Sequence, residues 1–274
     1  MKKLLGAIAA LAMTVGLAAC GTPANQGTTN PNQLVVGMEA GYPPFNWTQN
    51  DDSNGGVKIQ GTNQYAGGYD VEIAKLVAQK LGKELVIVKT EWDGLTPALI
   101  SGKIDAIIAG MSPTEERKAT IDFTDSYYDS QLVLVVKKGS KYENATSLAD
   151  FAGAKVTAQL NTFHYSVIDQ IPGVDKQAAM DNFPAMRVAL QAGTIDAYVS
   201  ELPEAQSAQS ANSDFVMVKL TDGFKASPED TQTAVGVKKD SPLTKEINEA
   251  LKTISSEERL QIMQDAIKNQ PAAE

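Results

Sequence analysis

Apolar and polar positions along the chain switch repeatedly between a helical period and short apolar runs. From Asp70 to Leu81, apolar residues recur every three or four positions, which predicts a helix capped by Asp70 and ended by Gly82. Apolar runs without alternation predict strands at 34–36, 85–88, 104–110, 132–136, 155–159, 195–200, 215–220 and 233–237. Further helices are expected at 95–101, 114–119, 162–170 and 184–192, and from 242 and 256 onward. Strands and helices that alternate in this way are typical of the α/β class.

One nine-residue pattern occurs twice. Residues 98–106 and 189–197 both read A-L-x-x-G-x-I-D-A, which predicts a helix end, a glycine and a strand. We expect both strands to lie buried in parallel sheets. The two copies are too far apart for a solenoid, whose repeats span about 20 to 50 residues. The pattern favours two similar α/β lobes with a ligand cleft between their strand ends, although helix–glycine–strand units are common in any α/β protein.

The beginning of the chain has the features of an export signal. Lys2 and Lys3 precede an apolar segment, which ends in L-A-A-C-G at 17–21. This ending resembles the lipobox of bacterial lipoproteins, in which the cysteine receives lipid and becomes the first mature residue. We therefore predict a signal peptide at 1–19, a lipidated Cys20 on a flexible tether at 20–32, and an extracytoplasmic protein anchored to the bacterial cell membrane. The alternative is an ordinary signal peptide with a chance cysteine.

Composition excludes several classes of function. The net charge of −9 argues against nucleic-acid binding, which needs clustered lysine and arginine. Cys20 is the single cysteine, so the sequence excludes intramolecular disulfides and cysteine-ligated metals. No apolar stretch outside the signal reaches the roughly 18 residues that a membrane-spanning helix needs. We expect a monomer without metal or cofactor, built from the about 240 residues that follow the tether.

The segment that begins at Trp92, WDGLTPALISGKIDAIIAGMSPTEERKATIDFTDSYY, closely resembles the polar amino-acid solute-binding proteins of ABC importers. Other matches follow in the family's order, namely Val36-Gly37 with YPPF at 42–45, GYDVEIA at 68–74, SLAD at 147–150 and the segment 193–203. The resemblance covers about residues 34–268. It implies two α/β lobes of the type II periplasmic binding protein kind, joined by a two-strand hinge. Lobe 1 would comprise 33–130 plus 226–274, and lobe 2 would comprise 131–225.

The resemblance also implies a ligand, which is a free polar amino acid bound by hinge closure and passed to an ABC permease with its ATPase. Arg117 would bind the ligand carboxylate through paired hydrogen bonds, with help from Ser112. Glu201 would hold the ammonium group, where the family usually has aspartate. Alternatives are a surface salt bridge of Arg117 with its acidic neighbours, and a helix-start role for Glu201.

Four further residues complete the site that the resemblance implies. Tyr42 and Trp92 would sandwich the ligand side chain, or serve only as core. Thr162 would offer a hydroxyl and a helix N-terminus, or only cap its helix. The family often has Gly-Thr-Thr or Gly-Thr-Ser here, whereas this chain has N-T-F at 161–163. Gly110 would let the ligand approach the backbone.

Glu39 is the clue to specificity. Members of the family that bind basic amino acids carry an acid at this position, which favours arginine, then lysine or histidine. A glutamine or glutamate type of ligand is the alternative, as is a solvated Glu39. Two other functions stay open, a secreted dehydratase-like enzyme with Glu201 as general acid and a sensor without transport. His164, the single histidine, is expected on a helix surface, with a place at the edge of the ligand cleft as the alternative. Asp122 and Asp125 are expected in a loop.

Overall fold

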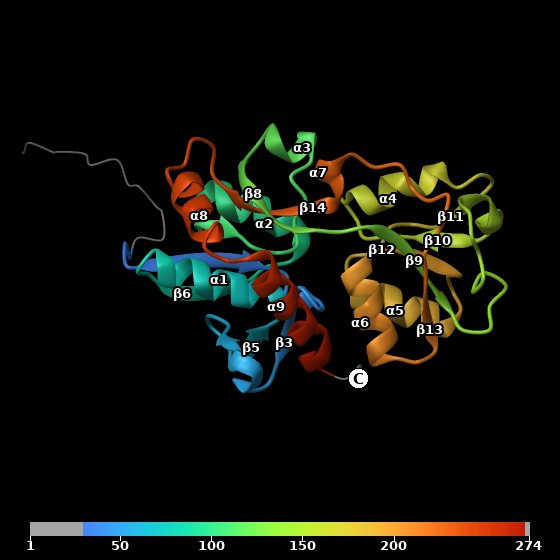
Figure 1. Ribbon diagram of the computed structural model, residues 1–274, viewed down its shortest axis with the longest axis horizontal. Helices are drawn as coiled ribbons and strands as arrows, with labels where there is room; N and C mark the ends of the chain where they lie inside the picture. Colours follow the sequence, from blue (N-terminus) through green and yellow to red (C-terminus); the bar gives the residue numbers. More distant parts are fainter. Residues whose placement is uncertain (1–29, 272–274) are drawn as a thin grey trace, which may run out of the picture.

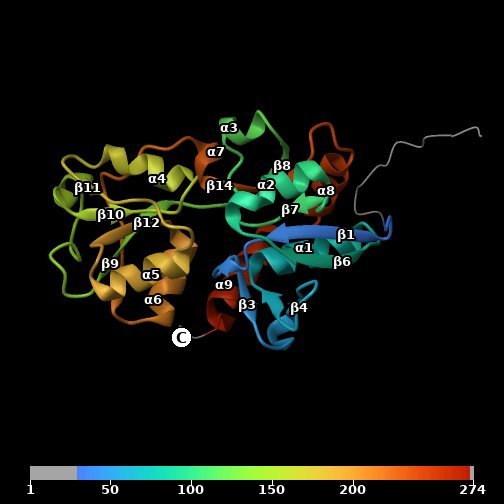
Figure 2. The same ribbon diagram turned by 180° about the vertical axis from the view of Figure 1, so that it is seen from behind.

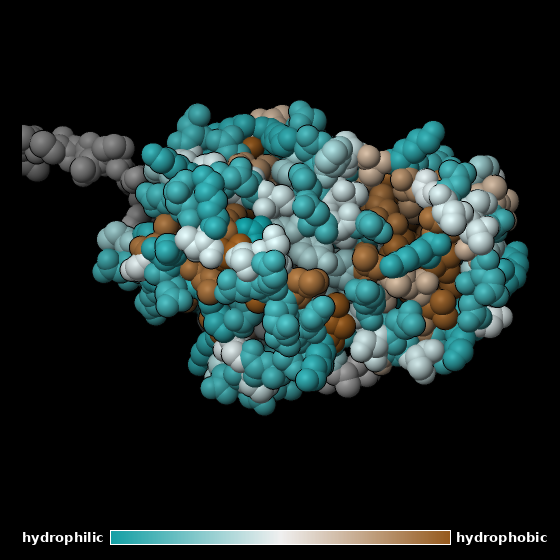
Figure 3. Space-filling view, viewed as in Figure 1, coloured by the Kyte–Doolittle hydropathy of each residue, from teal (hydrophilic) through white to brown (hydrophobic). Residues whose placement is uncertain are grey.

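The computed structural model describes residues 30–271, which form two lobes side by side (Figure 1). The predicted signal peptide, Cys20 and most of the tether lie outside these residues. No helix among the described residues is long and apolar enough to cross a membrane. Figure 3 shows a mainly hydrophilic face with apolar patches over both lobes, as an acidic, water-exposed protein requires.

The first lobe is built on a mixed five-stranded sheet in the order β6-β1-β7-β14-β8. These strands are β6 (Glu84–Lys89), β1 (Gln33–Met38), β7 (Ala106–Ile107), β14 (Gln232–Val237) and β8 (Asp122–Asp129). The helices of this lobe are α1 (Tyr69–Lys80), α2 (Trp92–Ser101), α3 (Glu115–Lys118), α8 (Leu243–Leu251) and α9 (Ser256–Asn269). A small sheet of β2 (Gly41–Tyr42), β3 (Asn46–Gln49), β5 (Tyr65–Gly67) and β4 (Val57–Lys58), with the turn η1 (Ser53–Gly55), extends it.

The second lobe repeats this plan with strands in the order β11-β10-β12-β9-β13. They are β11 (Asp175–Lys176), β10 (Lys155–Thr157), β12 (Ala197–Glu201), β9 (Leu132–Lys137) and β13 (Phe215–Val218). Its helices are α4 (Phe163–Val167), α5 (Phe183–Ala192) and α6 (Leu202–Ala211), with the turns η2 (Leu148–Phe151) and η3 (Ile168–Gln170). The short α7 (Pro228–Thr231) lies where the chain returns to the first sheet.

The chain crosses between the sheets twice, from β8 to β9 and from β13 back to β14. The crossings meet where the backbone N–H of Ser130 donates to the carbonyl of Thr231 at 2.9 Å. A third contact joins the lobes at the end of α9, where the Gln270 side-chain amide donates to the Ser207 carbonyl of α6 at 3.1 Å. Figures 1 and 2 both show α9 beside α6. Two backbone links and the end of α9 therefore connect the lobes, together with side-chain contacts across the cleft.

The repeated pattern produces the same local structure in both lobes. Gly102 and Gly193 end their helices with φ of +77° and +72°, values that favour glycine. The aspartate of each copy then accepts a hydrogen bond from a backbone N–H of the neighbouring strand. Asp105 accepts from Val35 at 2.9 Å, and Asp196 accepts from Lys155 at 2.8 Å. Each pattern thus ends a helix and fixes the strand in the middle of its sheet.

The structure corrects three expectations about elements. The strands after the two glycines lie in mixed sheets, because β7 and β12 each pair parallel on one side and antiparallel on the other. Asp122 and Asp125 lie in β8, a strand hidden by its alternating polar residues. Asp70 is inside α1 and fully buried, and it accepts hydrogen bonds from Asn46 Nδ2 (2.8 Å) and Tyr127 Oη (2.7 Å).

We predict that Gly193→Ala lowers the free energy of unfolding by about 1 kcal/mol, because alanine is strained at φ of +72°. No atom lies within 4 Å of the added Cβ, so strain is the only cost. Thermal unfolding should show a fall in Tm of about 2 to 4 °C. The Tm of Gly193→Asn should fall less than that of Gly193→Ala. Gly223 has no positive φ, so Gly223→Ala should leave the Tm unchanged. An unchanged Tm for Gly193→Ala would contradict the shared cap.

Candidate ligand-binding site

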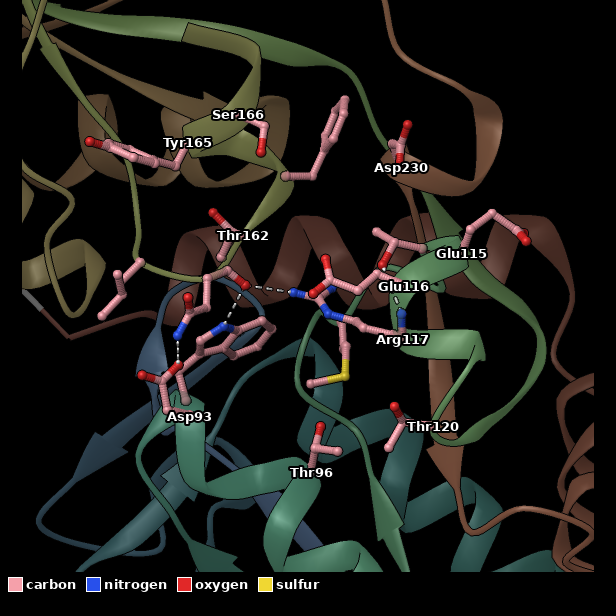
Figure 4. A pocket seen from close by; sticks show the side chains of 16 residues that line it. Asp93, Thr96, Glu115, Glu116, Arg117, Thr120, Thr162, Tyr165, Ser166 and Asp230 are labelled. Carbon is pink, nitrogen blue, oxygen red and sulfur yellow. Dashed lines mark hydrogen bonds between the residues drawn. The ribbon is translucent and has the colours of Figure 1, made fainter. Parts of the chain in front are cut away.

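A cleft of about 740 Å³ lies between the lobes (Figure 4). Its first-lobe side comes from α2, α3 and the loop after β7, and its second-lobe side from the segment that opens α4. The lining residues are Trp92, Asp93, Thr96, Met111, Thr114, Glu115, Glu116, Arg117, Thr120, Leu160, Asn161, Thr162, Phe163, Tyr165, Ser166 and Asp230. In the part of the chain that the structure describes, no group of three or more histidine, cysteine, aspartate or glutamate side chains is arranged to hold a metal.

Arg117 points into this cleft from α3. Its guanidinium donates to the Ser112 carbonyl at 2.9 Å and, across the cleft, to the Asn161 carbonyl at 3.2 Å. It also lies 5.0 Å from the centre of the Trp92 ring, within range of a cation–π contact. Burial lowers the pKa of Arg117 to about 10, so the group stays charged at neutral pH.

The expected alternative for Arg117, a surface salt bridge, is not what the structure shows. Glu115 pairs instead with Lys118, at 3.0 Å between Oε1 and Nζ. Within residues 30–271, no carboxylate forms a salt bridge with Arg117. A half-buried cation therefore faces the cleft with only neutral carbonyl partners. A carboxylate would satisfy it better than those carbonyls do.

Glu201 is the counterpart of Arg117 on the second lobe. It ends β12, and it is fully buried. One carboxylate oxygen, Oε1, lies 3.1 Å from His164 Nε2, whereas Oε2 has no hydrogen-bond partner among the described residues. The nearby Glu204 differs, because it forms an ion pair with Arg187 at 2.8 Å. Burial is the main cause of the lowered pKa of Arg117 and of the raised pKa of Tyr42, and the charge of Glu201 adds a smaller upward contribution to both, so the two lobes interact electrostatically.

Glu39 lies on the first lobe just after β1 and is also buried. Its Oε2 accepts a hydrogen bond from Gln159 Nε2 of the second lobe at 3.1 Å. The same amide donates to the Asp181 carbonyl at 3.0 Å. Burial raises the pKa of Glu39 to about 7. The structure therefore joins Glu39 to the opposite lobe through a neutral partner.

The aromatic residues are arranged differently from the expected sandwich. Tyr42 stacks between Phe45, at 4.9 Å between ring centres, and Phe183 of the second lobe, at 4.4 Å. Its hydroxyl is buried without a partner among the described residues. Trp92 lies by Arg117, and its Nε1 donates to the Asn161 carbonyl at 3.4 Å. The two rings thus contact different parts of the opposite lobe.

Gly110 packs against protein rather than leaving open space. Its φ is +62°, and an added Cβ would lie 2.7 Å from the Tyr42 ring. Its N–H donates to Tyr127 Oη at 3.1 Å. Gly110 therefore packs closely beside Tyr42, and its role in a close approach of the ligand stays a prediction.

The two expected hydroxyls are already donating. Ser112 Oγ donates to the Asp230 carbonyl at 3.0 Å, and Thr162 Oγ1 donates to the Gln159 carbonyl at 2.7 Å. Thr162 does precede a helix, but α4 has only five residues, so it has little helix dipole. Both oxygens keep their capacity to accept a hydrogen bond from a ligand.

Sequence reasoning missed Gln159, Asn161 and Phe183, and placed His164 wrongly. His164 is buried against Glu201 instead of lying on a helix surface. Gln159 ends a predicted strand, and the strand-end rule would have pointed to it. Asn161 acts through its backbone carbonyl at φ of +54°, and Phe183 through stacking across the lobes, which no motif signals.

Comparison with known proteins agrees with this geometry. Residues 34–267 match the bacterial extracellular solute-binding proteins, family 3. The arginine-binding extracellular protein ArtP of Bacillus subtilis is 29% identical over 263 residues, which are 95% of this chain and 96% of that protein. The glutamine-binding protein GlnH of the same organism is 30% identical over 282 residues, covering 99% and 100%.

Solved structures agree as well. An amino-acid ABC transporter substrate-binding protein from Streptococcus pneumoniae, bound to L-arginine, superimposes with a TM-score of 0.76 at 27% identity, covering 86% of this chain and 94% of that one. The two-lobed architecture is therefore shared with type II binding proteins, and the function is transport-related binding, not catalysis. This chain belongs to the bacterial extracellular solute-binding proteins, family 3.

Proposed function

We propose that this protein binds a free amino acid with a basic side chain, arginine above all, and delivers it to an ABC permease. The observation that carries the proposal is the pair of Arg117 and Glu201 on opposite lobes. Each has charge that no protein ion pair neutralises among the described residues, apart from the contact of Glu201 with His164. A free amino acid brings the two missing charges in one molecule.

The energetics favour a zwitterion over either charge alone. Burying a carboxylate or an ammonium group costs several kcal/mol unless the group is paired and hydrogen-bonded. Arg117 offers a fork of donors to the carboxylate, and Glu201 Oε2 offers an acceptor to the ammonium group. A ligand that lacks either charge would leave one protein charge buried and unpaired.

The division of the site between lobes supports binding by hinge closure. Arg117, Trp92 and Glu39 come from the first lobe, and Thr162 and Glu201 from the second. Two backbone crossings join the lobes, so rotation about them would open the cleft. A ligand that contacts both lobes then stabilises the closed form, which is the form we expect the permease to recognise.

Glu39 supports a basic side chain. It is a buried acid whose partner, Gln159, is neutral, and a guanidinium group would supply the missing opposite charge. Asp93, Glu115 and Glu116 at the cleft lining add negative potential that attracts cations. ArtP is named as an arginine-binding protein and the pneumococcal protein was solved bound to L-arginine, which agrees with this assignment.

Glutamine is the second candidate, and a specific observation favours it. With a pKa raised to about 7, Glu39 is neutral in a large fraction of molecules and then donates a hydrogen bond to an amide oxygen. GlnH is a glutamine-binding relative, and an ancestral arginine-binding protein has been solved with glutamine bound. Neutral and cationic side chains therefore compete for one subsite.

The predicted signal and Cys20 support attachment to the outer face of the cell membrane. A lipid on Cys20 and the tether up to residue 32 would keep the lobes near the permease. Labelling with a radioactive fatty acid tests this part, since Cys20→Ser would abolish the label and release the protein.

We predict that arginine gives the largest thermal shift among the twenty amino acids when added to refolded, ligand-free protein. Ligand at 100 times its Kd stabilises the folded state by about 2.7 kcal/mol. Lysine or histidine should follow, and D-arginine serves as the matched control, since it misplaces one of the two charges. No shift with any amino acid would contradict the proposed function, and a largest shift with glutamine would reverse the assignment of the side chain.

We predict that Arg117→Ala weakens amino-acid binding by about 100-fold or more, because a buried carboxylate loses its partner. Arg117→Lys should recover only part of the loss, since an ammonium group does not form the paired hydrogen bonds. Isothermal titration calorimetry measures both. Thr120→Val is the control, because it changes an uncharged residue at the same cleft outside the proposed contacts. Equal affinities of wild type and Arg117→Ala would remove Arg117 from the site.

We predict that arginine affinity rises with pH through about 7 and then levels, because Glu39 is neutral below its raised pKa and negative above it. Arginine binding should accordingly lower the pKa of Glu39 and release a proton near neutral pH. Glu39→Gln should weaken arginine binding about tenfold at pH 8, since one ion pair is lost. It should also remove the dependence of arginine affinity on pH that comes from Glu39. Glutamine affinity should change little in the same variant. A uniform loss for both ligands would assign Glu39 to structure instead.

A further inference from the structure

We propose that His164 is a positioning residue that orients Glu201 toward the ligand ammonium group and makes capture of any α-amino acid weaken as the imidazole takes up a proton. The inference rests on the proposed function. It adds a dependence on pH to the binding of the ammonium group, which all α-amino acids share. It is independent of Glu39, which acts on the side chain.

The geometry isolates a two-residue cluster buried in the second lobe, with His164 between the cleft-lining residues Phe163 and Tyr165 in the sequence. His164 lies in α4 with only 8% of its surface exposed, and Glu201 has none exposed. Their contact is 3.1 Å, between Nε2 and Oε1. The imidazole edge also meets the Phe183 ring, with 6.4 Å between ring centres and 81° between planes. Packing and hydrogen bonding therefore hold both side chains in one arrangement.

The unused atoms of this cluster explain its chemistry. Among the described residues, His164 Nδ1 and Glu201 Oε2 are buried and have no hydrogen-bond partner. A carboxylate only accepts, so Nε2 carries the hydrogen in the 3.1 Å contact, and Nδ1 of a neutral ring is an acceptor. The hydrogen bond occupies Oε1 and leaves Oε2 as the acceptor for an ammonium group.

A proton on Nδ1 changes this arrangement. The ring becomes a cation in direct contact with the carboxylate, so His164 and Glu201 neutralise each other. An incoming ammonium group then meets a pair with no net charge. The imidazolium of that pair also repels the ammonium group. Histidine is the side chain that proteins most often use for such a change of charge. By linkage, a bound ammonium group must in turn disfavour the proton.

The effect of pH on other groups around the pair must be distinguished from its effect on His164. From the first lobe, Arg117, Asp70 and the hydroxyls of Tyr42 and Tyr128 all feel the charge of Glu201. Arg117 keeps its charge, and burial raises the pKa values of both tyrosines, so these three stay fixed between pH 5 and 8.

Two other carboxyl groups near this cluster belong to Asp70 and Glu204. Burial raises the pKa of Asp70 to about 7, so Asp70 titrates in the same window, as Glu39 does. Glu204, on the far side, is paired with Arg187. A substitution at His164 alone therefore separates the imidazole from the titrating carboxyls.

The chain offers a direct test, because His164 is its single histidine. In protein purified without a histidine tag, the imidazole carbon-bound protons give one set of nuclear magnetic resonance signals to follow from pH 5 to 8.5. We expect saturating L-arginine to lower the titration midpoint by about one pH unit, which corresponds to a tenfold linkage. The same fall in Glu39→Gln would show that the side-chain subsite is not its source. An imidazole that does not titrate, or a midpoint that ligand leaves unchanged or raises, would overturn the inference.

Calorimetry with His164→Gln provides the second arm, because the glutamine amide can donate to Glu201 but cannot take up a proton. From pH 8 to pH 5.5, wild type should lose about tenfold more affinity for L-glutamine or L-arginine than the variant loses. Equal losses in both proteins would overturn the role of His164. A protein that binds no amino acid at pH 8 would instead overturn the proposed function itself. If His164→Gln fails to fold, the titration of the wild-type imidazole still decides.

Discussion

Burial of opposite charges on separate lobes is the constraint on which this structure depends. Arg117 faces the cleft with carbonyl partners only, and Glu201 keeps one carboxylate oxygen without a partner in the described part of the chain. Either charge would be stabilised by a partner that the other lobe does not supply. A two-lobed protein with this pattern gains most from a ligand that carries both opposite charges.

The fold brings these charges to one place by using the same device twice. Each copy of the repeated pattern ends a helix with a left-handed glycine and fixes the next strand through an aspartate on a neighbouring backbone N–H. In the first lobe the chain then runs to Ser112 and Arg117, and in the second it runs to Glu201. Corresponding parts of the two lobes therefore carry opposite charges, with Arg117 lining the cleft and Glu201 buried at the end of β12.

The sequence was sufficient for the class of fold, because apolar periodicity and the repeat are local signals. The roles of Arg117 and Glu201 came from the resemblance to a family and stay predictions. It was insufficient where tertiary contacts decide. β8 has a polar alternating sequence that suggested a loop, and it is a strand because it pairs with β14. His164 has the sequence context of an exposed helix, yet Glu201, a residue far along the chain, buries it.

The same limit applies to the aromatic residues and to the backbone groups. Tyr42 was predicted as a wall of the ligand site, but its ring stacks on Phe183 from the opposite lobe. Asn161 contributes a carbonyl to Arg117 and Trp92, and side-chain chemistry gives no sign of such a role. Pairing across two lobes depends on how the lobes close, and no local pattern encodes that geometry.

The most direct test of ligand binding by Arg117 and Glu201 together is a crystal structure of the protein with the amino acid that binds most tightly. In that structure we expect the ligand carboxylate to bind the Arg117 guanidinium and the ammonium group to bind Glu201 Oε2. Both lobes should then contact one ligand molecule. A ligand held by one lobe alone, or one whose carboxylate and ammonium groups lie away from these two residues, would contradict it.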